Sequence, residues 1–318
     1  MIAFPVGQAL VALCSAIPSL RSLFASAGVT PSQFGQRAVP VQIPGRAEHL
    51  LFTGVGNHHL TFQLFWRGMN YYEPFTRTTI EAIAGTSDWF IDVGANIGLF
   101  SLVAARVNPT LKVVAFEPNP DMFARLSAHQ QLNDLSNLAP EPIALSNQDG
   151  EATLFLTTSP MSASLVPEFQ HEINPAVRSV AVKTVTLDSY VERAGISGSV
   201  LVKVDVEGHD KAFFEGAVKT IRTLKPDLIV EVLNEYEPAR LQCLRELGYR
   251  FYKITNQGLV ETPVVNLTRI GDFTFFNYLF STRPPAVLES ISQWIKILAP
   301  TIDLYQTSKY ATHLNSNT

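Results

Sequence analysis

The chain has 318 residues, with 24 basic and 28 acidic side chains and a formal net charge of −4 at pH 7. Apolar residues make up 46% of it, enough to bury a full core, while charged residues make up only 16%. The sequence has no lysine and arginine run and no alternation of aromatic with basic residues, which argues against nucleic acid as a main partner. The two cysteines, Cys14 and Cys243, lie far apart, which fits a reduced compartment or no redox role.

From residue 74 onward, short apolar runs alternate with helix-like patterns. Helices are expected over residues 74–84, 97–107, 120–132, 211–224 and 238–247. Strands are expected over residues 89–93, 112–116, 142–145, 152–156, 180–187, 200–204, 227–232, 250–254 and 273–280. Asp149-Gly150 predicts a hairpin turn, and the last two strands should pair antiparallel at one edge. The alternation predicts an α/β fold with a mostly parallel, doubly wound sheet.

Two extensions flank the core domain, which we expect over residues 71–282. Residues 1–70 are expected to form a helical or irregular extension packed on the core, and residues 283–318 a helix or tail. Residues 1–20 carry no charge, but prolines interrupt a spanning helix and the positive start of a secretory signal is missing. We expect this apolar segment to pack on the domain, with peripheral membrane contact as the alternative.

The most informative stretch, residues 90–100, reads F-I-D-V-G-A-N-I-G-L-F. Glycines at Gly94 and Gly98 permit a tight turn and close approach of a ligand, and the free N–H groups of the next helix favour a polar or anionic ligand end. A dinucleotide fingerprint would read G-x-G-x-x-G, but here the turn is G-x-N-x-G and Asp92 precedes it. A carboxylate at this place repels a pyrophosphate and suits a ligand with a positively charged amino group, such as S-adenosylmethionine (SAM).

A second acid, Glu117, ends the next expected strand. An acid at that point of a βαβ unit can accept both hydroxyl groups of a ribose. Together with Asp92 and the glycine turn, it predicts a cofactor site.

A cluster of polar residues, Asp205, Glu207 and His209, follows the apolar strand 200–204. Ligands of open parallel sheets bind at the carboxyl ends of the strands, so this cluster is the predicted catalytic centre. A hydroxyl acceptor must lose a proton to a nearby base. His209 and Glu207 remain alternatives for that base, and Asp205 is expected to anchor cofactor or acceptor. The three side chains are also a conceivable divalent metal site, but the sequence favours no metal.

Glu231 is an acid within an expected apolar strand, where unpaired burial is costly. It either faces the acceptor, and then belongs with the catalytic residues, or forms a buried pair.

These residues give the chain a resemblance to the FkbM family of SAM-dependent methyltransferases, over about residues 70–281. The motifs that carry it are Tyr72-Glu73-Pro74, Phe90-Ile91-Asp92-Val93-Gly94-Ala95-Asn96-Ile97-Gly98, Phe116-Glu117-Pro118-Asn119-Pro120, Ala144-Leu145-Ser146, Thr186-Leu187-Asp188 and Val202-Lys203-Val204-Asp205-Val206-Glu207-Gly208-His209-Asp210. One small departure is Asp210, where the family commonly has glutamate. The resemblance implies the Rossmann-like class I methyltransferase fold, with SAM as cofactor, and O-methylation of a sugar, glycolipid or secondary-metabolite hydroxyl. It leaves the acceptor and the oligomeric state undetermined.

The resemblance also implies roles for individual residues. The residues that would hold the methionine end of SAM are Asp92, Gly94, Asn96 and Gly98. Glu117 would bind the ribose, with Asn119 beside it. Ser146 would lie near the adenine rim, or it forms an ordinary turn. Glu73 would close over the cofactor, or it merely places charge at a helix start. Such an enzyme would work in the cytoplasm, where its cofactor is made.

Two rival functions remain at this point. A nicotinamide-dependent oxidoreductase would share the α/β pattern, but Asn96 and Leu99 stand where two fingerprint glycines should be. A non-catalytic SAM-binding protein would keep the glycine turn but would need no acid-histidine cluster.

Overall fold

The computed structural model describes residues 38–54, 58–157, 163–167, 176–232, 238–265, 268–270 and 273–301. Residues 1–37, with the uncharged apolar segment, lie outside this description. The central sheet has eight strands in the order β12-β11-β15-β10-β9-β3-β4-β5. These strands are β3 (Trp89–Val93), β4 (Lys112–Phe116), β5 (Leu138–Glu141), β9 (Val200–Val204), β10 (Asp227–Glu231), β11 (Arg250–Thr255), β12 (Gly258–Glu261) and β15 (Asn277–Ser281). The predicted α/β fold is confirmed.

Strands β5, β4, β3, β9 and β10 run parallel. Starting from β3, the chain adds β4 and β5 on one side and later β9 and β10 on the other. The order therefore reverses between β3 and β9, and ligands of such sheets bind beside this switch point. Strand β15 pairs antiparallel with both β10 and β11. The expected antiparallel pair thus exists, but β12 rather than that pair forms the edge.

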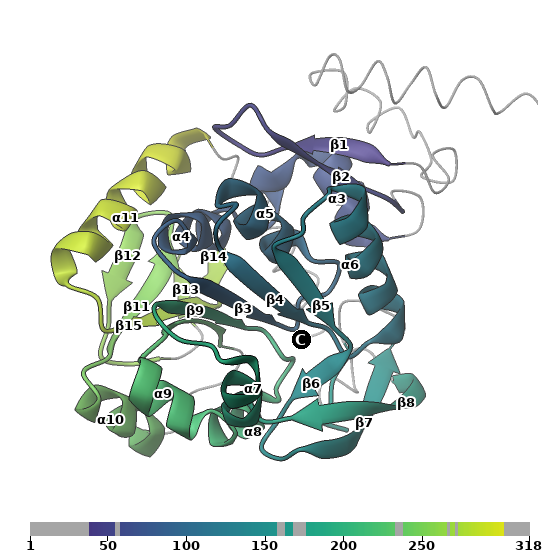
Figure 1. The fold of residues 1–318 in the computed structure, drawn as a ribbon. Helices are drawn as coiled ribbons and strands as arrows, with labels where there is room; N and C mark the ends of the chain where they lie inside the picture. The colour runs from purple at the N-terminus through teal and green to yellow at the C-terminus, as the bar shows by residue number, and fades with distance from the viewer. Residues whose placement is uncertain are drawn as a thin grey trace, which may run out of the picture.

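Helices cover both faces of the sheet (Figure 1). The first face packs on α4 (Pro74–Ala84), α5 (Leu99–Val107), α6 (Pro120–Leu132) and α11 (Pro285–Leu298). The second packs on α7 (Leu187–Ala194), α8 (Asp210–Glu215), α9 (Val218–Leu224) and α10 (Pro238–Glu246). Side chains alternate along each strand: Phe90 enters the core under the first group and Ile91 the core under the second.

The structure differs from expectation around Asp149-Gly150. Strands β6 (Ile143–Leu145) and β7 (Gly150–Thr157) are not neighbours, because β8 (Ala176–Val185) lies between them in a separate three-stranded sheet. The predicted hairpin is therefore wrong. The Asp149 carboxylate accepts a hydrogen bond of 2.8 Å from the Thr186 backbone N–H, which fastens it to the end of β8.

A second difference is the break in the helix expected over residues 211–224. It forms as α8 and α9, separated at Gly216. A Cβ on Gly216 would lie 2.0 Å from the Ser146 carbonyl oxygen, so the loop after β6 packs against the chain at this break.

The described part of the amino-terminal extension is not only helical or irregular. Strands β1 (Val39–Gln42) and β2 (His49–Phe52) pair antiparallel, followed by α3 (His59–Arg67) and a 3-10 turn (Met69–Tyr71). The side chain of Asn133 accepts from the Leu51 N–H and donates to the Leu51 carbonyl, both at 2.8 Å, and so fastens β2 to α6.

The remaining elements lie near the carboxyl terminus. They are β13 (Thr268–Ile270), β14 (Phe273–Phe275) and the 3-10 turn Ala299–Thr301. Within the ranges that the structure describes, no helix is both long and apolar enough to cross a membrane.

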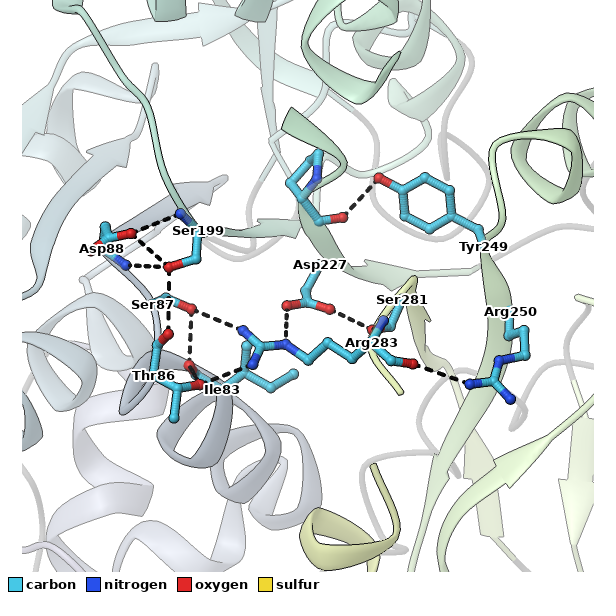
Figure 2. Close-up of polar contacts among 11 residues, drawn as sticks. Ile83, Thr86, Ser87, Asp88, Ser199, Asp227, Tyr249, Arg250, Ser281 and Arg283 are labelled. Carbon is cyan, nitrogen blue, oxygen red and sulfur yellow. Dashed lines mark hydrogen bonds and ion pairs between the residues drawn. The ribbon is translucent and has the colours of Figure 1, made fainter. Parts of the chain in front are cut away.

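The amino-terminal end of the parallel strands carries a polar network (Figure 2). Ser199, which precedes β9, donates from its hydroxyl and its backbone to the Asp88 carboxylate, both at 2.8 Å. Asp227, at the start of β10, accepts from the Ser281 hydroxyl at 2.5 Å and pairs with Arg283 at 2.6 Å. Arg283 also donates to the Thr86 hydroxyl. Because the Ser199 hydroxyl also contacts the Thr86 carbonyl, these bonds join the ends of four strands, β3, β9, β10 and β15, to the segment after α4.

Candidate active site

The predicted site residues gather at the carboxyl ends of β3, β4, β9 and β10. Asp92 on β3 is paired in register with Lys203 on β9. Residues paired in this way point to the same face of a sheet. Both side chains therefore lie on the face that α4 and α5 cover, beside the switch point.

The turn after β3 is packed directly against the chain after β9. Gly94 adopts a φ of 80°, and a Cβ there would lie 1.8 Å from the Asp205 carbonyl oxygen. The backbone N–H groups of Gly94 and Ala95 both donate to the Phe116 carbonyl at 3.0 Å. Three strand ends are therefore held together by a contact that only glycine permits.

Asn96 and Gly98 complete the turn with left-handed backbones, at φ of 52° and 86°. The Asn96 side chain accepts from the Ile97 N–H at 2.8 Å, and Gly98 is the N-cap of α5. Asparagine tolerates this conformation better than most residues. This local chemistry explains the G-x-N-x-G spacing without reference to a ligand.

Glu117 is only 6% exposed. One carboxylate oxygen accepts from the Asn96 N–H at 2.7 Å and the other from the Asn119 N–H at 2.8 Å. Burial raises the pKa of Glu117 to about 7, although the two backbone donors oppose the rise. The carboxylate is thus fixed in direction, and each oxygen keeps a lone pair for a further donor. Asn119 uses its own side chain to cap α6, accepting from the Asp121 N–H at 3.1 Å.

Asp92 is completely buried. The Ser101 hydroxyl donates to one carboxylate oxygen at 2.5 Å, while the other oxygen makes no hydrogen bond with any described residue. Burial raises the pKa of Asp92, and the nearby ammonium of Lys203 lowers it. Asp92 therefore lies beneath the turn, with one acceptor atom left open. Sequence reasoning missed Ser101, because the contact of its hydroxyl with Asp92 depends on how α5 packs on the sheet.

Lys203 is the main residue that sequence reasoning missed. It is 2% exposed, and its ammonium donates to Asp205 at 2.8 Å and lies 5.0 Å from the ring centre of Phe100. Burial by itself would lower the pKa of Lys203, but the carboxylates of Asp205, Asp92 and Glu73 outweigh it and raise the pKa. The available signal was a lysine inside the otherwise apolar strand V-L-V-K-V.

Asp205, Glu207 and Glu231 form a group of interacting acids, of which Asp205 and Glu207 also interact with this ammonium. Burial favours protonation of Asp205, but Lys203 and a hydrogen bond from Glu231 overcome this and hold its pKa below the ordinary value. Burial and the charge of Asp205 raise the pKa of Glu231 well above its ordinary value. A shared proton therefore resides on Glu231, which donates to Asp205. Glu231 is therefore paired with Asp205, and this pairing leaves its predicted role toward an acceptor as a prediction.

Glu207 stands in a left-handed backbone, at φ of 48°. Burial and the charge of Asp205 raise its pKa to about 8, while Lys203 opposes the rise. The carbonyl of Glu207 accepts from the Ser164 hydroxyl at 2.7 Å.

Glu73 reaches the same group from the start of α4. Its carboxylate accepts from the Asn277 side chain, at the start of β15, at 3.0 Å. Burial raises the pKa of Glu73, and Lys203 lowers it. Glu73 is also left-handed, at φ of 40°, and its side chain does not cap α4. It therefore does more than place charge at a helix start.

His209 lies apart from these acids. Its Nε2 is 3.0 Å from the Ser146 hydroxyl, in the loop after β6. Burial lowers its pKa, and the charges that oppose this are those of Asp210 and Glu215. The expected cluster is therefore divided: Asp205 and Glu207 surround Lys203, while His209 pairs with Ser146. Over the ranges that the structure describes, no group of three His, Cys, Asp or Glu side chains is arranged to hold a metal ion.

The chain is similar in sequence to known methyltransferases. The family model of the methyltransferase FkbM domain matches residues 92–251. The hexuronic acid methyltransferase AglP of Haloferax volcanii is 27% identical over 190 residues, covering 60% of this chain and 70% of that protein. Methyltransferase sdnD of Sordaria araneosa is 32% identical over 184 residues, covering 56% of this chain and 67% of that protein. Among solved structures, methyltransferase FkbM from Methylobacillus flagellatus KT is 14% identical with a TM-score of 0.39, over 61% of this chain and 43% of that one.

Proposed function

The chain belongs to the FkbM family of methyltransferases, and on this premise we propose that it transfers the methyl group of SAM to a hydroxyl oxygen of a sugar, glycolipid or small metabolite. A sugar acceptor is supported by the related hexuronic acid methyltransferase. Membership of a methyltransferase family removes the nicotinamide-dependent alternative. The reaction would take place in the cytoplasm, where SAM is made.

The observation that carries the proposal is the surplus of acid beside the switch point. Glu73, Asp92, Asp205 and Glu207 interact with the buried ammonium of Lys203, and Glu231 is hydrogen-bonded to Asp205 beside them. Such a group would repel an anionic ligand and attract a cationic one. SAM, when bound, supplies a methyl group on a positively charged sulfonium. The residues present therefore fit SAM.

Glu117 is the residue best suited to the ribose. Its two oxygens are aimed by backbone N–H groups, and a pKa of about 7 shows that the carboxylate lacks compensation for its burial. Two hydroxyl donors would supply that compensation. The backbone of Gly94, Asn96 and Gly98 would hold the methionine end, with Asp92 supporting the turn from below. Ser146 remains a candidate for the adenine rim.

We assign the base role to Glu207 rather than His209. A base should have a pKa near the working pH, and Glu207 has one of about 8, beside Asp205. His209 is engaged with Ser146, and its pKa is lowered. Glu207 would accept the proton of the acceptor hydroxyl as the methyl group is transferred, while Asp205 and Glu231 would hold the acceptor or cofactor.

Calorimetric titration with SAM is the first test. Saturable binding to the wild-type protein, weakened about tenfold or more in Glu117→Gln, would support the cofactor site. Asp121→Asn, an exposed acid on α6, is the matched control and should bind SAM as the wild type does. Absence of SAM binding by the folded wild-type protein would contradict the proposal.

Turnover then separates an enzyme from a non-catalytic SAM-binding protein. A screen of hydroxylated sugars, uronic acids included, should give a methyl ether and S-adenosylhomocysteine in equal amounts. Slow hydrolysis of SAM with every acceptor would leave a binding protein and contradict the catalytic part of the proposal.

A further inference from the structure

Lys203 is a buried cation to which the proposed chemistry gives no role. Its side chain lies in the middle of the sheet, donates to Asp205 at 2.8 Å and is sealed by Phe100 from α5. Burying an ammonium is costly unless it is paired and hydrogen-bonded, so a lysine at this place needs a reason.

We propose that Lys203 is a positioning residue, which keeps Asp205 ionised and holds its carboxylate in one orientation at the edge where cofactor and acceptor would meet. The inference rests on the proposed methyl transfer. It assigns to Lys203 no contact with the reacting atoms.

The surroundings of Asp205 show why it needs a cation. Glu231 on the neighbouring strand donates a hydrogen bond to it, and Glu207 two residues away adds negative potential. Burial also favours the neutral form of Asp205. The Glu231 hydrogen bond favours the ionised form, but without Lys203 it would stand alone against burial and the negative potential of Glu207, both of which favour a protonated Asp205.

The other groups that face Lys203 support this role. Asp92 on β3 and Glu73 before α4 both stabilise the ammonium, so it stays protonated and cannot take a proton from the acceptor. A base role is thereby excluded, and an electrostatic one remains. Phe100 and the sheet leave the ammonium only 2% exposed, so water screens its effect on Asp205 weakly.

A double-mutant cycle on SAM affinity tests the inference. The variants are Lys203→Met, Asp205→Asn and the two combined. If Lys203 acts through Asp205, each single change should weaken SAM binding by at least about fivefold, and the double variant should bind no more weakly than Asp205→Asn alone. Losses that multiply in the double variant would show that Lys203 acts independently, and would overturn the inference.

The pH profile gives a readout that a purely structural role would not move. In Lys203→Met, SAM affinity should rise more steeply with pH than in the wild type, because Asp205 must first lose a proton. The double variant has no carboxyl at position 205 and should lack that part of the rise. Identical profiles for the two variants would also overturn the inference.

Lys253 provides the matched control. It is another buried lysine of the same sheet, 5% exposed on β11, with its ammonium over the Tyr278 ring. Lys253→Met should show multiplicative, uncoupled effects with Asp205→Asn. If Lys203→Met does not fold, Lys203→Gln replaces it in the cycle, because its amide can donate to Asp205 but carries no charge. Failure of the wild-type protein to bind SAM would instead contradict the proposed function.

Discussion

The two ends of the central sheet differ in how far their carboxylates are stabilised by protein donors. At the amino-terminal end, Ser199 donors lower the pKa of Asp88, and Asp227 is held by Ser281 and Arg283 (Figure 2). At the carboxyl end, burial raises the pKa values of Glu117, Glu207 and other acids, and the Lys203 ammonium interacts with only some of them. The first end satisfies its carboxylates within the protein. The second leaves several of its acids with raised pKa values, because burial outweighs the donors that the protein supplies.

Removing the proposed base should produce the largest effect. Glu207→Gln should lower kcat by about 100-fold or more, because a positioned base contributes on that scale. His209→Gln should lower it by less than about tenfold. Rates with saturating SAM and acceptor test this, and a reversed order of the two variants would return the base role to His209.

Next in size is the effect of a methyl group at Gly94. Gly94→Ala should destabilise the protein by about 3 kcal/mol and abolish SAM binding, because the new Cβ meets the Asp205 carbonyl and the backbone is left-handed. Gly45→Ala has a similar φ, of 76°, but no atom within 4 Å of the added Cβ. It should cost only about 1 kcal/mol. Urea unfolding of both variants measures the difference. Equal losses in the free energy of unfolding would mean that the left-handed backbone alone, and not the contact with Asp205, requires glycine at position 94.

Neutralising one acid at each end sharpens the comparison directly. Asp227→Asn should lose about 2 kcal/mol of stability, because it breaks a buried ion pair with Arg283, and should keep its SAM affinity. Glu231→Gln should stay within about 0.5 kcal/mol of the wild type, since an amide can replace the protonated carboxyl as donor to Asp205. Unfolding and SAM titration of both variants test the contrast. A larger loss of stability in Glu231→Gln than in Asp227→Asn would contradict the expected contrast between the two ends.

The smallest expected effect is a slope of stability with pH. Glu117 and Glu207 have folded pKa values of about 7 and about 8, above the ordinary value of 4.5, so the folded state binds more protons than the unfolded state between about pH 4.5 and pH 8. The unliganded protein should therefore lose at least about 1 kcal/mol of stability as pH rises from 5 to 8. Denaturation at several pH values measures this. Glu207→Gln should flatten the slope, and an unchanged slope would mean that Glu207 does not titrate in this range.

Local patterns predicted the elements well. The bounds of α4, α6, β3, β4 and β9 agree with expectation. These elements are signalled by apolar periodicity and, in the two helices, by a proline at the first position, and both signals lie within the segment itself. The glycine turn and the acids at the strand ends were also found in this way.

Contacts between segments were harder to predict. Lys203 lies beside Asp92 because of the register of β3 and β9, and Asn277 contacts Glu73 at the start of α4; no local pattern encodes either contact. For the same reason, the contact between His209 and Ser146 was not foreseen, because it joins segments 63 positions apart. The failed hairpin at Asp149-Gly150 has a similar cause, since β8 arrives from later in the sequence and separates β6 from β7.

The contact between Glu73 and Asn277 has a consequence for the time course of synthesis. It joins residues 204 positions apart, and Asn277 begins the last strand to enter the sheet. A nascent chain that has not yet reached Asn277 lacks both the partner of Glu73 and strand β15 beside β10. Because chains emerge from the ribosome amino terminus first, the acid-lined edge is completed only after residue 277 has been synthesised. A growing chain that carries Glu73 and the strand ends β3, β4, β9 and β10 would thus still lack one wall of this edge until β15 joins the sheet.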